Sequence, residues 1–379
     1  MNIGFSACVL QGGRTGVASY VINLLHTLQD VDSVNRYDVL IPDADKGLIR
    51  DGPASFRKTI IPDWLAKPVA NILWHNVALP ARSRREGYDL VHVPSYRRLP
   101  MVKGTRIVAT VHDLATLHMD NKYDAARMFY NRRIVPALIR RADHIITVSH
   151  FTASDLVNLV GYPADQITVV YSGIHRQAYR PIPPEECRAQ LKAKYELEAP
   201  FIVFVSRVEH PAKNHLRLIQ AFERIKARRP SDLKLVLAGA DWNGAETVRD
   251  YAARSPVARD VVFTGFVPLA DIPYFYSGCE LMAYPSLFEG FGFPILEAMS
   301  CGAPVVCSNT SSMKEIAIDL APTFDPTNVD EIAGVLEDGL KQGRSAQQAA
   351  RGMTYAGTFD WKDSAKKVMD VYRLTASGA

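Results

Sequence analysis

The chain has 379 residues, of which 47% are apolar and 22% charged, with 44 Lys and Arg against 40 Asp and Glu. This composition is typical of a folded globular protein and excludes disordered, collagen-like and highly charged coiled-coil chains. The length fits two domains better than one. No stretch approaches the about 18 consecutive apolar residues of a membrane helix, and the non-basic start predicts a buried strand rather than a secretory signal.

Cysteine usage and charge narrow the class of protein further. The five cysteines are odd in number and never form a C-x-x-C pair, which predicts reduced thiols in a cytoplasmic protein. Residues 1–180 carry 22 Lys and Arg against 15 Asp and Glu, a net charge of +7, whereas the remainder has 22 against 25, or −3. A basic first half fits a phosphate-rich partner and, equally, a solvated surface. The positive charges are dispersed and no recognition motif appears, so we expect no nucleic-acid partner.

Short Val- and Ile-rich runs alternate with helical patterns along the whole chain. In the first half the expected strands are 3–9, 37–41, 90–93, 107–111 and 145–148, and the expected helices are 17–28, 65–79, 124–139 and 151–159. After a proline-rich stretch at 179–184, strands recur at 201–205, 233–238, 261–263, 281–284 and 304–307. Continuous apolar strands separated by helices predict parallel sheets covered on both faces.

The predicted fold class is therefore α/β, with two doubly wound, Rossmann-like domains. We place the first at residues 1–178 and the second at 179–359, joined by the proline-rich stretch. The last segment, 360–379, has a helical pattern anchored by a tryptophan and is expected to pack back onto the first domain. In such folds the ligand lies at the carboxyl ends of the strands, so we expect it in a crevice there.

The motif most indicative of chemistry spans residues 284–307 and predicts strand, glycine loop, helix and strand. Pro294 suits the first position of the helix and Gly302 the position after its end. Gly290 and Gly292 let backbone amides approach a ligand where a helix N-terminus presents unpaired donors. This arrangement predicts an anion site suited to a diphosphate.

The same motif carries two carboxylates, Glu289 and Glu297. A carboxylate repels phosphate but accepts hydrogen bonds from neighbouring hydroxyls, as in a sugar or a ribose. One acid in the loop and one on the first helical turn could therefore hold a sugar and a ribose on either side of a diphosphate. For either residue alone, an acid favoured by the helix dipole is the simpler explanation.

Other candidate residues also follow predicted strands. Arg207 and Lys213 come after strand 201–205, where two cations could neutralise a diphosphate leaving group, although either alone is more often a surface charge. His112 follows strand 107–111. The turn 11–17 resembles a phosphate-binding loop but matches neither the dinucleotide fingerprint nor the P-loop. Asp43 and Asp45 match a D-x-D metal pattern, and we interpret them as a turn and expect no metal.

Segment 62–85 has a helical apolar stripe formed by Leu65, Val69, Ile72, Leu73 and Val77. Two tryptophans flank the stripe and three arginines follow it: Trp64, Trp74, Arg82, Arg84 and Arg85. A basic amphipathic helix with tryptophans can lie on an anionic membrane. A helix packed on a core explains the stripe equally well.

Taken together, these elements resemble the retaining, nucleotide-sugar-dependent glycosyltransferases of family 4, which have the GT-B fold. The matching segments span nearly the whole chain: 15–21, 111–114, 145–149, 169–174, 206–208 with 213–214, 263–267 and 285–299. The last segment is highly specific. The chain departs from the family pattern at Thr15–Gly16, which stands where the family has two glycines, and at Ser206 and Ser172. Which of Gly12, Gly13 and Gly16 approaches a ligand is therefore open.

The resemblance implies a role for each matched residue. Glu289 would hold hydroxyls of the donor sugar and Glu297 the ribose diol. Arg207 and Lys213 would clamp the diphosphate, and His112 would lie beside the reacting centre. The remaining donor contacts would come from backbone groups of Gly16, Val267, Gly290, Phe291 and Gly292.

The expected activity is transfer of a hexosyl group, with retention, from GDP-mannose or a UDP-hexose to a hydroxyl of a glycan or polyprenyl-diphosphate-linked acceptor. No cofactor or metal is expected. We expect a cytoplasmic location, with peripheral attachment to an anionic membrane through segment 62–85 as an open alternative. A sugar-nucleotide epimerase of the same fold, or a non-catalytic sugar-nucleotide-binding subunit, would also fit the pattern.

Overall fold

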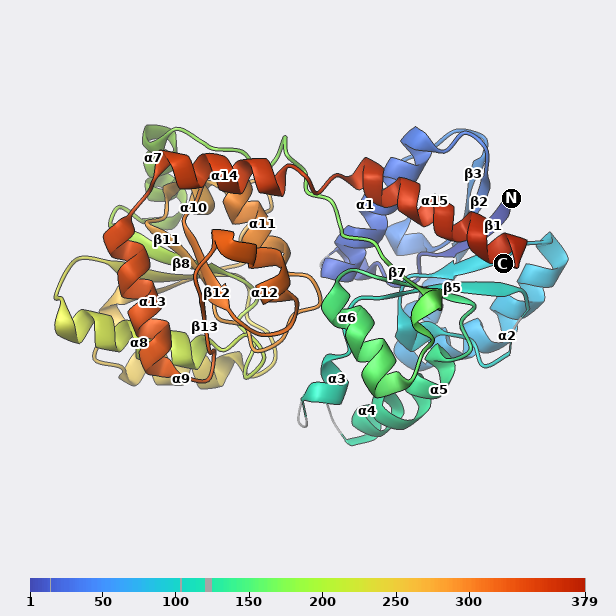
Figure 1. Cartoon of the computed structure of the whole chain (residues 1–379), viewed down its shortest axis with the longest axis horizontal. Coiled ribbons are helices and arrows are strands. Elements are labelled where there is room, and N and C mark those ends of the chain that lie inside the picture. The colour runs from blue at the N-terminus through green and yellow to red at the C-terminus, as the bar shows by residue number, and fades with distance from the viewer. Residues whose placement is uncertain (14, 103, 120–124, 379) are drawn as a thin grey trace. The chain divides into compact units, whose positions relative to one another are not determined.

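The computed structural model describes residues 1–13, 15–102, 104–119 and 125–378. The chain divides into two compact units (Figure 1). Unit 1 comprises Met1–Gly173 and Asp360–Ala379, and unit 2 comprises Ile174–Phe359. The division thus falls at Gly173, whereas the sequence placed a boundary at residue 178. In the described residues no helix combines the length and apolar character needed to cross a membrane.

The sheet of unit 1 has seven parallel strands in the order β3-β2-β1-β4-β5-β6-β7. Their bounds are β1 Asn2–Ser6, β2 Arg36–Pro42, β3 Phe56–Ile61, β4 Leu90–Val93, β5 Arg106–Val111, β6 His144–Thr147 and β7 Ile167–Val169. The five predicted strands are the five inner ones. Strands β3 and β7 were not predicted, because they form the two edges, where half-exposed residues replace the continuous apolar run of a buried strand.

The sheet of unit 2 has six parallel strands in the order β10-β9-β8-β11-β12-β13. Their bounds are β8 Phe201–Val205, β9 Lys234–Ala238, β10 Val261–Gly265, β11 Leu281–Tyr284, β12 Val305–Ser308 and β13 Thr323–Phe324. All five predicted strands are present, and β13, a two-residue edge strand, was missed. Strands β8 and β11 are neighbours in the sheet, so the loops that follow them leave the same edge.

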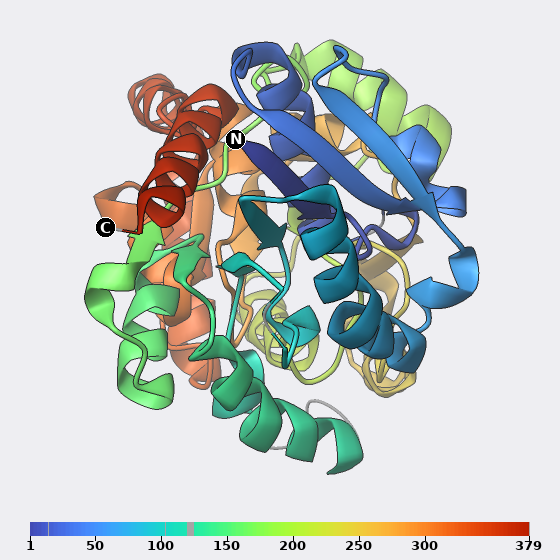
Figure 2. The same ribbon diagram turned by 90° about the vertical axis from the view of Figure 1, so that its right-hand side faces the viewer.

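Helices cover both faces of the sheet in unit 1 (Figure 2). One face carries α1 (Gly16–Val31) and α15 (Trp361–Ser377), which pack on each other. The other carries α2 (Pro68–Glu86) and α5 (Val135–Ile139), which share an apolar core with the π-helical turns that follow α4 (Ala125–Phe129) and α6 (His150–Asp155). Turns of π-helix follow α4 and α6, so the predicted helices 124–139 and 151–159 are not continuous α-helices. The predicted first residue Asp124 lies outside the described residues. A short α3 (Ala115–His118) completes the unit.

The helices of unit 2 alternate with its strands, as the doubly wound pattern requires. Their bounds are α7 Pro184–Tyr195, α8 His215–Arg228, α9 Ala245–Arg254, α10 Ile272–Gly278, α11 Phe293–Ser300, α12 Ser311–Ala317, α13 Val329–Gln342 and α14 Ala346–Ala356. Helices α8 and α13 pack together, as do α7 with α10 and α11 with α14.

The five cysteines of the chain are buried free thiols.

Helix α15 is anchored within unit 1 by contacts that leave no room for larger groups. A Cβ on Gly173 would lie 2.2 Å from the backbone nitrogen of Trp361, so this position requires glycine. The Ser364 hydroxyl donates to the Tyr171 carbonyl at 2.6 Å. Deeper in the unit, the Tyr372 hydroxyl lies 2.6 Å from Nδ1 of the buried His92. The last helix is therefore an integral layer of unit 1.

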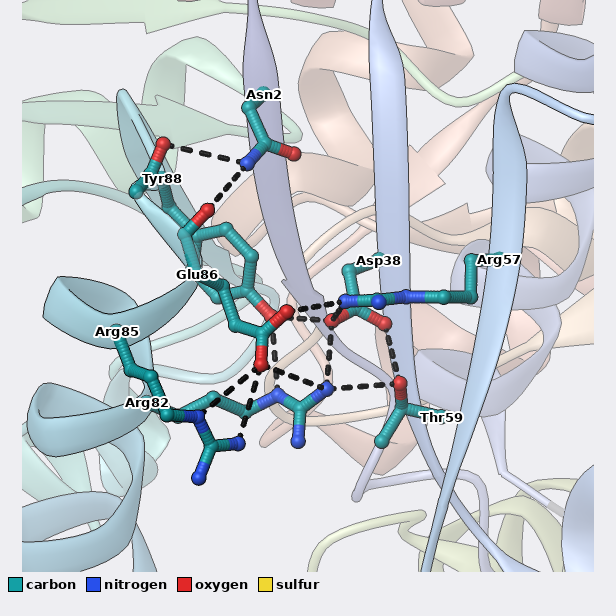
Figure 3. A network of polar contacts seen from close by, with 9 residues as sticks. Asn2, Asp38, Arg57, Thr59, Arg82, Arg85, Glu86 and Tyr88 are labelled. Atoms are coloured by element: carbon teal, nitrogen blue, oxygen red, sulfur yellow. Dashed lines mark hydrogen bonds and ion pairs between the residues drawn. The ribbon is translucent and has the colours of Figure 1, made fainter.

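A buried carboxylate, Asp38 on β2, ties α2 to the sheet (Figure 3). It accepts hydrogen bonds from Thr59 at 2.6 Å, from Arg82 at 2.9 Å and from the Tyr88 hydroxyl, and it pairs with Arg57. Burial alone would raise the pKa of Asp38, but these donors outweigh it and hold the pKa below its usual range. Arg82 belongs to the last turn but one of α2, so this network fixes how the helix is rotated.

Candidate active site

Two loops at the carboxyl ends of neighbouring strands bring most of the predicted residues of unit 2 together. Loop 206–214 connects β8 to α8 and carries Arg207 and Lys213. Loop 285–292 connects β11 to α11 and carries Glu289, and Glu297 follows on α11. Because β8 and β11 are adjacent and parallel, both loops emerge on one side of the sheet.

Hydrogen bonds join these two loops directly. The Asn214 amide donates to the Pro285 carbonyl at 3.0 Å and to the Pro326 carbonyl at 2.7 Å. The Leu287 backbone amide donates to the Ala212 carbonyl at 3.0 Å. Asn214 caps α8 with φ +61°, a left-handed conformation that asparagine adopts more readily than most residues. Asn214 thus positions Lys213, a role that the sequence pattern did not reveal.

Lys213 and Glu289 form an ion pair at the centre of this arrangement. The Lys213 Nζ lies 2.6 Å from Glu289 Oε1, and the side chains are 17% and 15% exposed. The hydroxyl of the fully buried Tyr284 donates to the same carboxylate oxygen at 3.0 Å. Burial alone would raise the pKa of Glu289, but the Lys213 charge and these hydrogen bonds hold it below the usual value. Glu289 is therefore a charged acceptor at neutral pH.

Two serines at the start of α12 hold the glycine loop in place. The Ser311 hydroxyl accepts a hydrogen bond from the Glu289 backbone amide at 3.0 Å. The Ser312 hydroxyl lies 3.0 Å from the carbonyl oxygens of both Glu289 and Phe291. Ser311 has φ +51°, an unfavourable conformation for a serine. Neither serine was predicted from the sequence.

Arg207 stacks on an aromatic ring that was not predicted from the sequence. Its guanidinium carbon lies 4.7 Å from the centre of the Trp242 ring, and Nη2 lies 3.1 Å from Glu209 Oε2. Trp242 comes from the loop after β9 and is about half exposed. Stacking fixes the plane of the guanidinium and leaves its edge for hydrogen bonds, which is the geometry that phosphate recognition uses.

Gly292 and Pro294 define the N-terminus of α11, where the sequence predicts an anion site. Gly292 precedes the helix with φ +101°, a value that side chains rarely allow, and Pro294 lies in its first turn. Gly302, with φ +69°, follows its end. The loop residues Gly290 and Phe291 lead into the helix, and the Phe291 ring is buried. The first amides of α11 therefore point out of the helix end that carries its partial positive charge.

Glu297 lies beyond the first turn of α11, not on it as the sequence predicted, because the helix begins at Phe293. Its surroundings are quite unlike those of Glu289. The Tyr276 hydroxyl donates to its Oε2 at 3.2 Å, and Tyr179 is a second neighbour. Burial raises the pKa of Glu297 to about 7, because hydrogen bonds from the two tyrosines only partly offset it. Val267 lies two residues beyond β10, and its side chain is buried.

The other two predicted residues, His112 and Gly16, belong to unit 1. His112 follows β5, its Nε2 lies 3.2 Å from the Pro94 carbonyl, and its ring packs edge-to-face on Tyr20 at 4.8 Å. Burial lowers the pKa of His112 to about 4, so the ring is neutral at pH 7. The carbonyl partner requires the proton on Nε2, which makes Nδ1 a hydrogen-bond acceptor.

Gly16 begins α1, and a Cβ on it would meet none of the described atoms within 4 Å. Gly12 and Gly13 instead have φ of +72° and +76°, so the turn itself requires them. The Gly12 amide donates to Asp45 Oδ1 at 2.9 Å, and Asp43 pairs with Lys46. In the described parts of the chain, no cluster of three or more His, Cys, Asp or Glu side chains is arranged to hold a metal.

The chain is similar to known proteins over most of its length. A family model described as "Glycosyltransferase Family 4" matches residues 14–178, and one described as "Glycosyl transferases group 1" matches residues 188–354. The O-antigen chain mannosyltransferase B of Escherichia coli is 32% identical over 271 residues, 71% of this chain and 70% of that protein. The serotype-specific mannosyltransferase WbdA of Escherichia coli is 30% identical over 70% of this chain, but only over 33% of its own length.

Among solved structures, a sucrose-phosphate synthase from Thermosynechococcus elongatus superposes with a TM-score of 0.79 over 100% of both chains at 19% identity. At that identity the likeness concerns the fold alone. It confirms the predicted fold class, GT-B, with two units that each contain a parallel sheet.

Proposed function

Because the chain belongs to the group 1 and family 4 glycosyltransferases, we propose that it is a retaining mannosyltransferase. Its donor would be GDP-mannose, and its acceptor a hydroxyl of a growing, lipid-linked glycan. The choice of mannose is supported by the two relatives at 30% and 32% identity, both of which are named mannosyltransferases. GDP is the nucleotide proposed, and UDP-hexoses are the competing donors in the test below.

The observation that carries this proposal is the ion pair between Lys213 and Glu289 beside the N-terminus of α11. Lys213 and Arg207 supply the positive charge that a departing diphosphate needs, and the first amides of α11 add donors for its oxygens. Glu289 is held in its charged form, in which it accepts hydrogen bonds from sugar hydroxyls. The two loops together would thus hold both the sugar and the diphosphate.

Retention follows if the acceptor attacks from the face that the diphosphate leaves. The acceptor oxygen bonds to the anomeric carbon while the bond from that carbon to the β-phosphate oxygen breaks. The acceptor proton passes to that phosphate oxygen, and the products are GDP and the mannosylated acceptor. Charge develops on the diphosphate in the transition state, so Arg207 and Lys213 would contribute most of the stabilisation.

The other predicted residues complete this assignment. Glu297 would accept hydrogen bonds from the ribose diol, and the main chain of Val267 would contact the base. The neutral ring of His112 would accept a hydrogen bond from a donor hydroxyl through Nδ1, and the backbone amide of Gly16 would donate to the donor phosphate or to the acceptor. The proposed mechanism uses no cofactor, because Arg207 and Lys213 supply the positive charge that a metal ion supplies in other sugar transferases. Turnover should therefore persist in a chelator.

The test is turnover by the purified protein with GDP-mannose, UDP-glucose or UDP-N-acetylglucosamine and a mannose-terminated acceptor. We expect GDP release that depends on acceptor and a product whose NMR coupling shows the anomeric configuration of the donor. An inverted product would refute retention, use of UDP-hexoses alone would refute the donor, and an altered sugar nucleotide without transfer would indicate an epimerase.

Matched variants make the test specific to the site. Glu289→Gln should abolish turnover, whereas Glu280→Gln should leave it unchanged. Glu280 is exposed and precedes the amino end of β11, the strand whose carboxyl end leads to Glu289. Binding without turnover in the wild type would instead indicate a non-catalytic sugar-nucleotide-binding subunit. Such binding would be detected as a rise in the Tm of the protein with GDP-mannose, because a ligand stabilises the folded state that binds it.

A further inference from the structure

The outer side of α2 in unit 1 exposes a row of large apolar side chains. Val69, Leu73 and Val77 are four residues apart and therefore lie along one face of the helix. They are 72%, 60% and 70% exposed, and Trp64, just before the helix, is 61% exposed. Single exposed apolar residues are common on protein surfaces, but a contiguous group of this size indicates an interaction site.

The opposite side of α2 is fully used by the fold. Trp74 and Leu79 are part of the apolar core, and the buried His75 lies 2.8 Å from the Ser6 hydroxyl of β1. Near the end of the helix, Arg82 pairs with the buried Asp38 (Figure 3). The apolar stripe predicted from the sequence therefore divides: Leu65 packs inward, whereas Val69, Leu73 and Val77 face outward. The helix cannot rotate to bury the outer row without breaking these contacts.

A neighbouring loop extends the same apolar surface. The Met101 backbone amide donates to the Asn76 side chain of α2 at 2.5 Å, which places this loop beside the helix. Met101 and Val102 are 45% and 53% exposed. We call the group formed by Trp64, Val69, Leu73, Val77, Met101 and Val102 the α2 surface.

Basic residues outnumber acidic residues around the α2 surface. Residues 63–86 and 97–102 contain six Lys or Arg against two acidic residues, Asp63 and Glu86, of which Glu86 pairs with Arg85. Lys67, Arg84 and Arg85 are exposed at the two ends of the helix. Apolar side chains with tryptophan at one end and basic residues around them match the composition of segments that insert into the headgroup region of an anionic bilayer.

We propose that the α2 surface docks unit 1 onto an anionic lipid bilayer, with Trp64, Leu73 and their neighbours at the headgroup level. The inference builds on the proposed function, since a lipid-linked acceptor would be presented at such a bilayer. The contact itself does not depend on catalysis, so it can be tested separately.

The experiment is flotation of the full-length protein with vesicles of 30% phosphatidylglycerol in phosphatidylcholine, compared with pure phosphatidylcholine. The wild type should float with the anionic vesicles and less in high salt, which screens charge. Leu73→Glu should weaken partitioning by about tenfold or more, because it replaces an inserted apolar side chain by a charge. The matched control is Val34→Glu, which places the same charge at a site of unit 1 that is 80% exposed and outside the α2 surface.

Each outcome decides the proposal. Flotation of the wild type and Val34→Glu but not of Leu73→Glu supports it. Equal flotation of all three proteins, or no flotation of the wild type, overturns it. A wild-type dimer that Leu73→Glu dissociates, without vesicle binding, would show that a second copy covers the α2 surface. Turnover with a lipid-free acceptor should be equal in all three proteins, so an inactive wild type that still floats would refute the proposed function alone.

Discussion

Replacing Lys213 by methionine tests the central ion pair through both stability and turnover. The substitution keeps the length of the side chain and removes the cation from Glu289, which is 15% exposed. Breaking a buried pair costs about 3–5 kcal/mol. Because both side chains retain some solvent contact, we expect about 2–3 kcal/mol for unit 2 at pH 8. For a domain of this size that corresponds to a fall in Tm of about 5–10 °C.

The pH dependence of this loss gives the sharper test. In the wild type the pKa of Glu289 lies below its usual value, so its stabilising contribution is present above the ordinary carboxyl pKa and is lost only as the pH falls through the lowered one. Without Lys213, burial raises the pKa of Glu289, and the variant loses stability as the pH rises through the raised pKa. The difference in Tm should therefore be largest at pH 8 and shrink towards pH 4.5.

Turnover separates the two roles of Lys213. Lys213→Met should lower kcat by about 10²–10³, the cost of removing one group that stabilises a developing charge. Adding Glu289→Gln to that variant should restore much of the Tm, because no buried charge remains, without restoring turnover. Thermal unfolding between pH 4.5 and 8 and initial-rate kinetics measure both effects. A Tm difference that does not change with pH, or wild-type turnover in folded Lys213→Met, would refute this account.

Three further predictions concern residues around the site and the fold. Burial raises the pKa of Glu297 to about 7. Its carboxyl group therefore loses its proton as the pH rises from 6 to 8, so the donor KM should fall over this range, and Glu297→Gln should remove this pH dependence. A wild-type KM that does not change with pH would contradict this prediction. Trp242→Ala should raise the donor KM about threefold with little change in kcat, because it frees the Arg207 guanidinium that it now orients; an unchanged KM would show that the stacking is incidental. Asp38→Asn should destabilise unit 1 by about 2–4 kcal/mol, measured by denaturant unfolding, with kcat unchanged; a loss below about 0.5 kcal/mol would show that the network contributes little.

The inner strands could be predicted from sequence because a strand buried on both faces is a continuous apolar run. The predicted strand 281–284 has the bounds of β11. Edge strands lack that signal, since one side of their backbone and some of their side chains meet water. This is why β3, with the sequence FRKTII, was missed. The face of α2 posed a different problem, because an apolar pattern alone does not show which residues of a helix are covered.

At the candidate site the sequence supplied residue types but not pairings. Lys213 and Glu289 were both predicted, yet their contact depends on the left-handed Asn214 and its bonds to Pro285 and Pro326. Single polar residues such as Ser311 carry no local pattern that distinguishes a loop-fixing hydroxyl from an exposed one. Such roles become visible only when the strands that carry the loops are placed side by side.

The two glutamates of the motif show how much depends on such partners. Glu289 and Glu297 are chemically identical, and burial acts on both in the same direction. Lys213 reverses that effect for Glu289, whereas Glu297 has neutral tyrosine neighbours and titrates near pH 7. One carboxylate is therefore charged at every physiological pH, and the other changes its charge within that range. A diphosphate that attracts Lys213 would weaken its hold on Glu289 and leave that carboxylate freer to accept sugar hydroxyls, so that binding of the phosphate and recognition of the sugar would be coupled through one lysine.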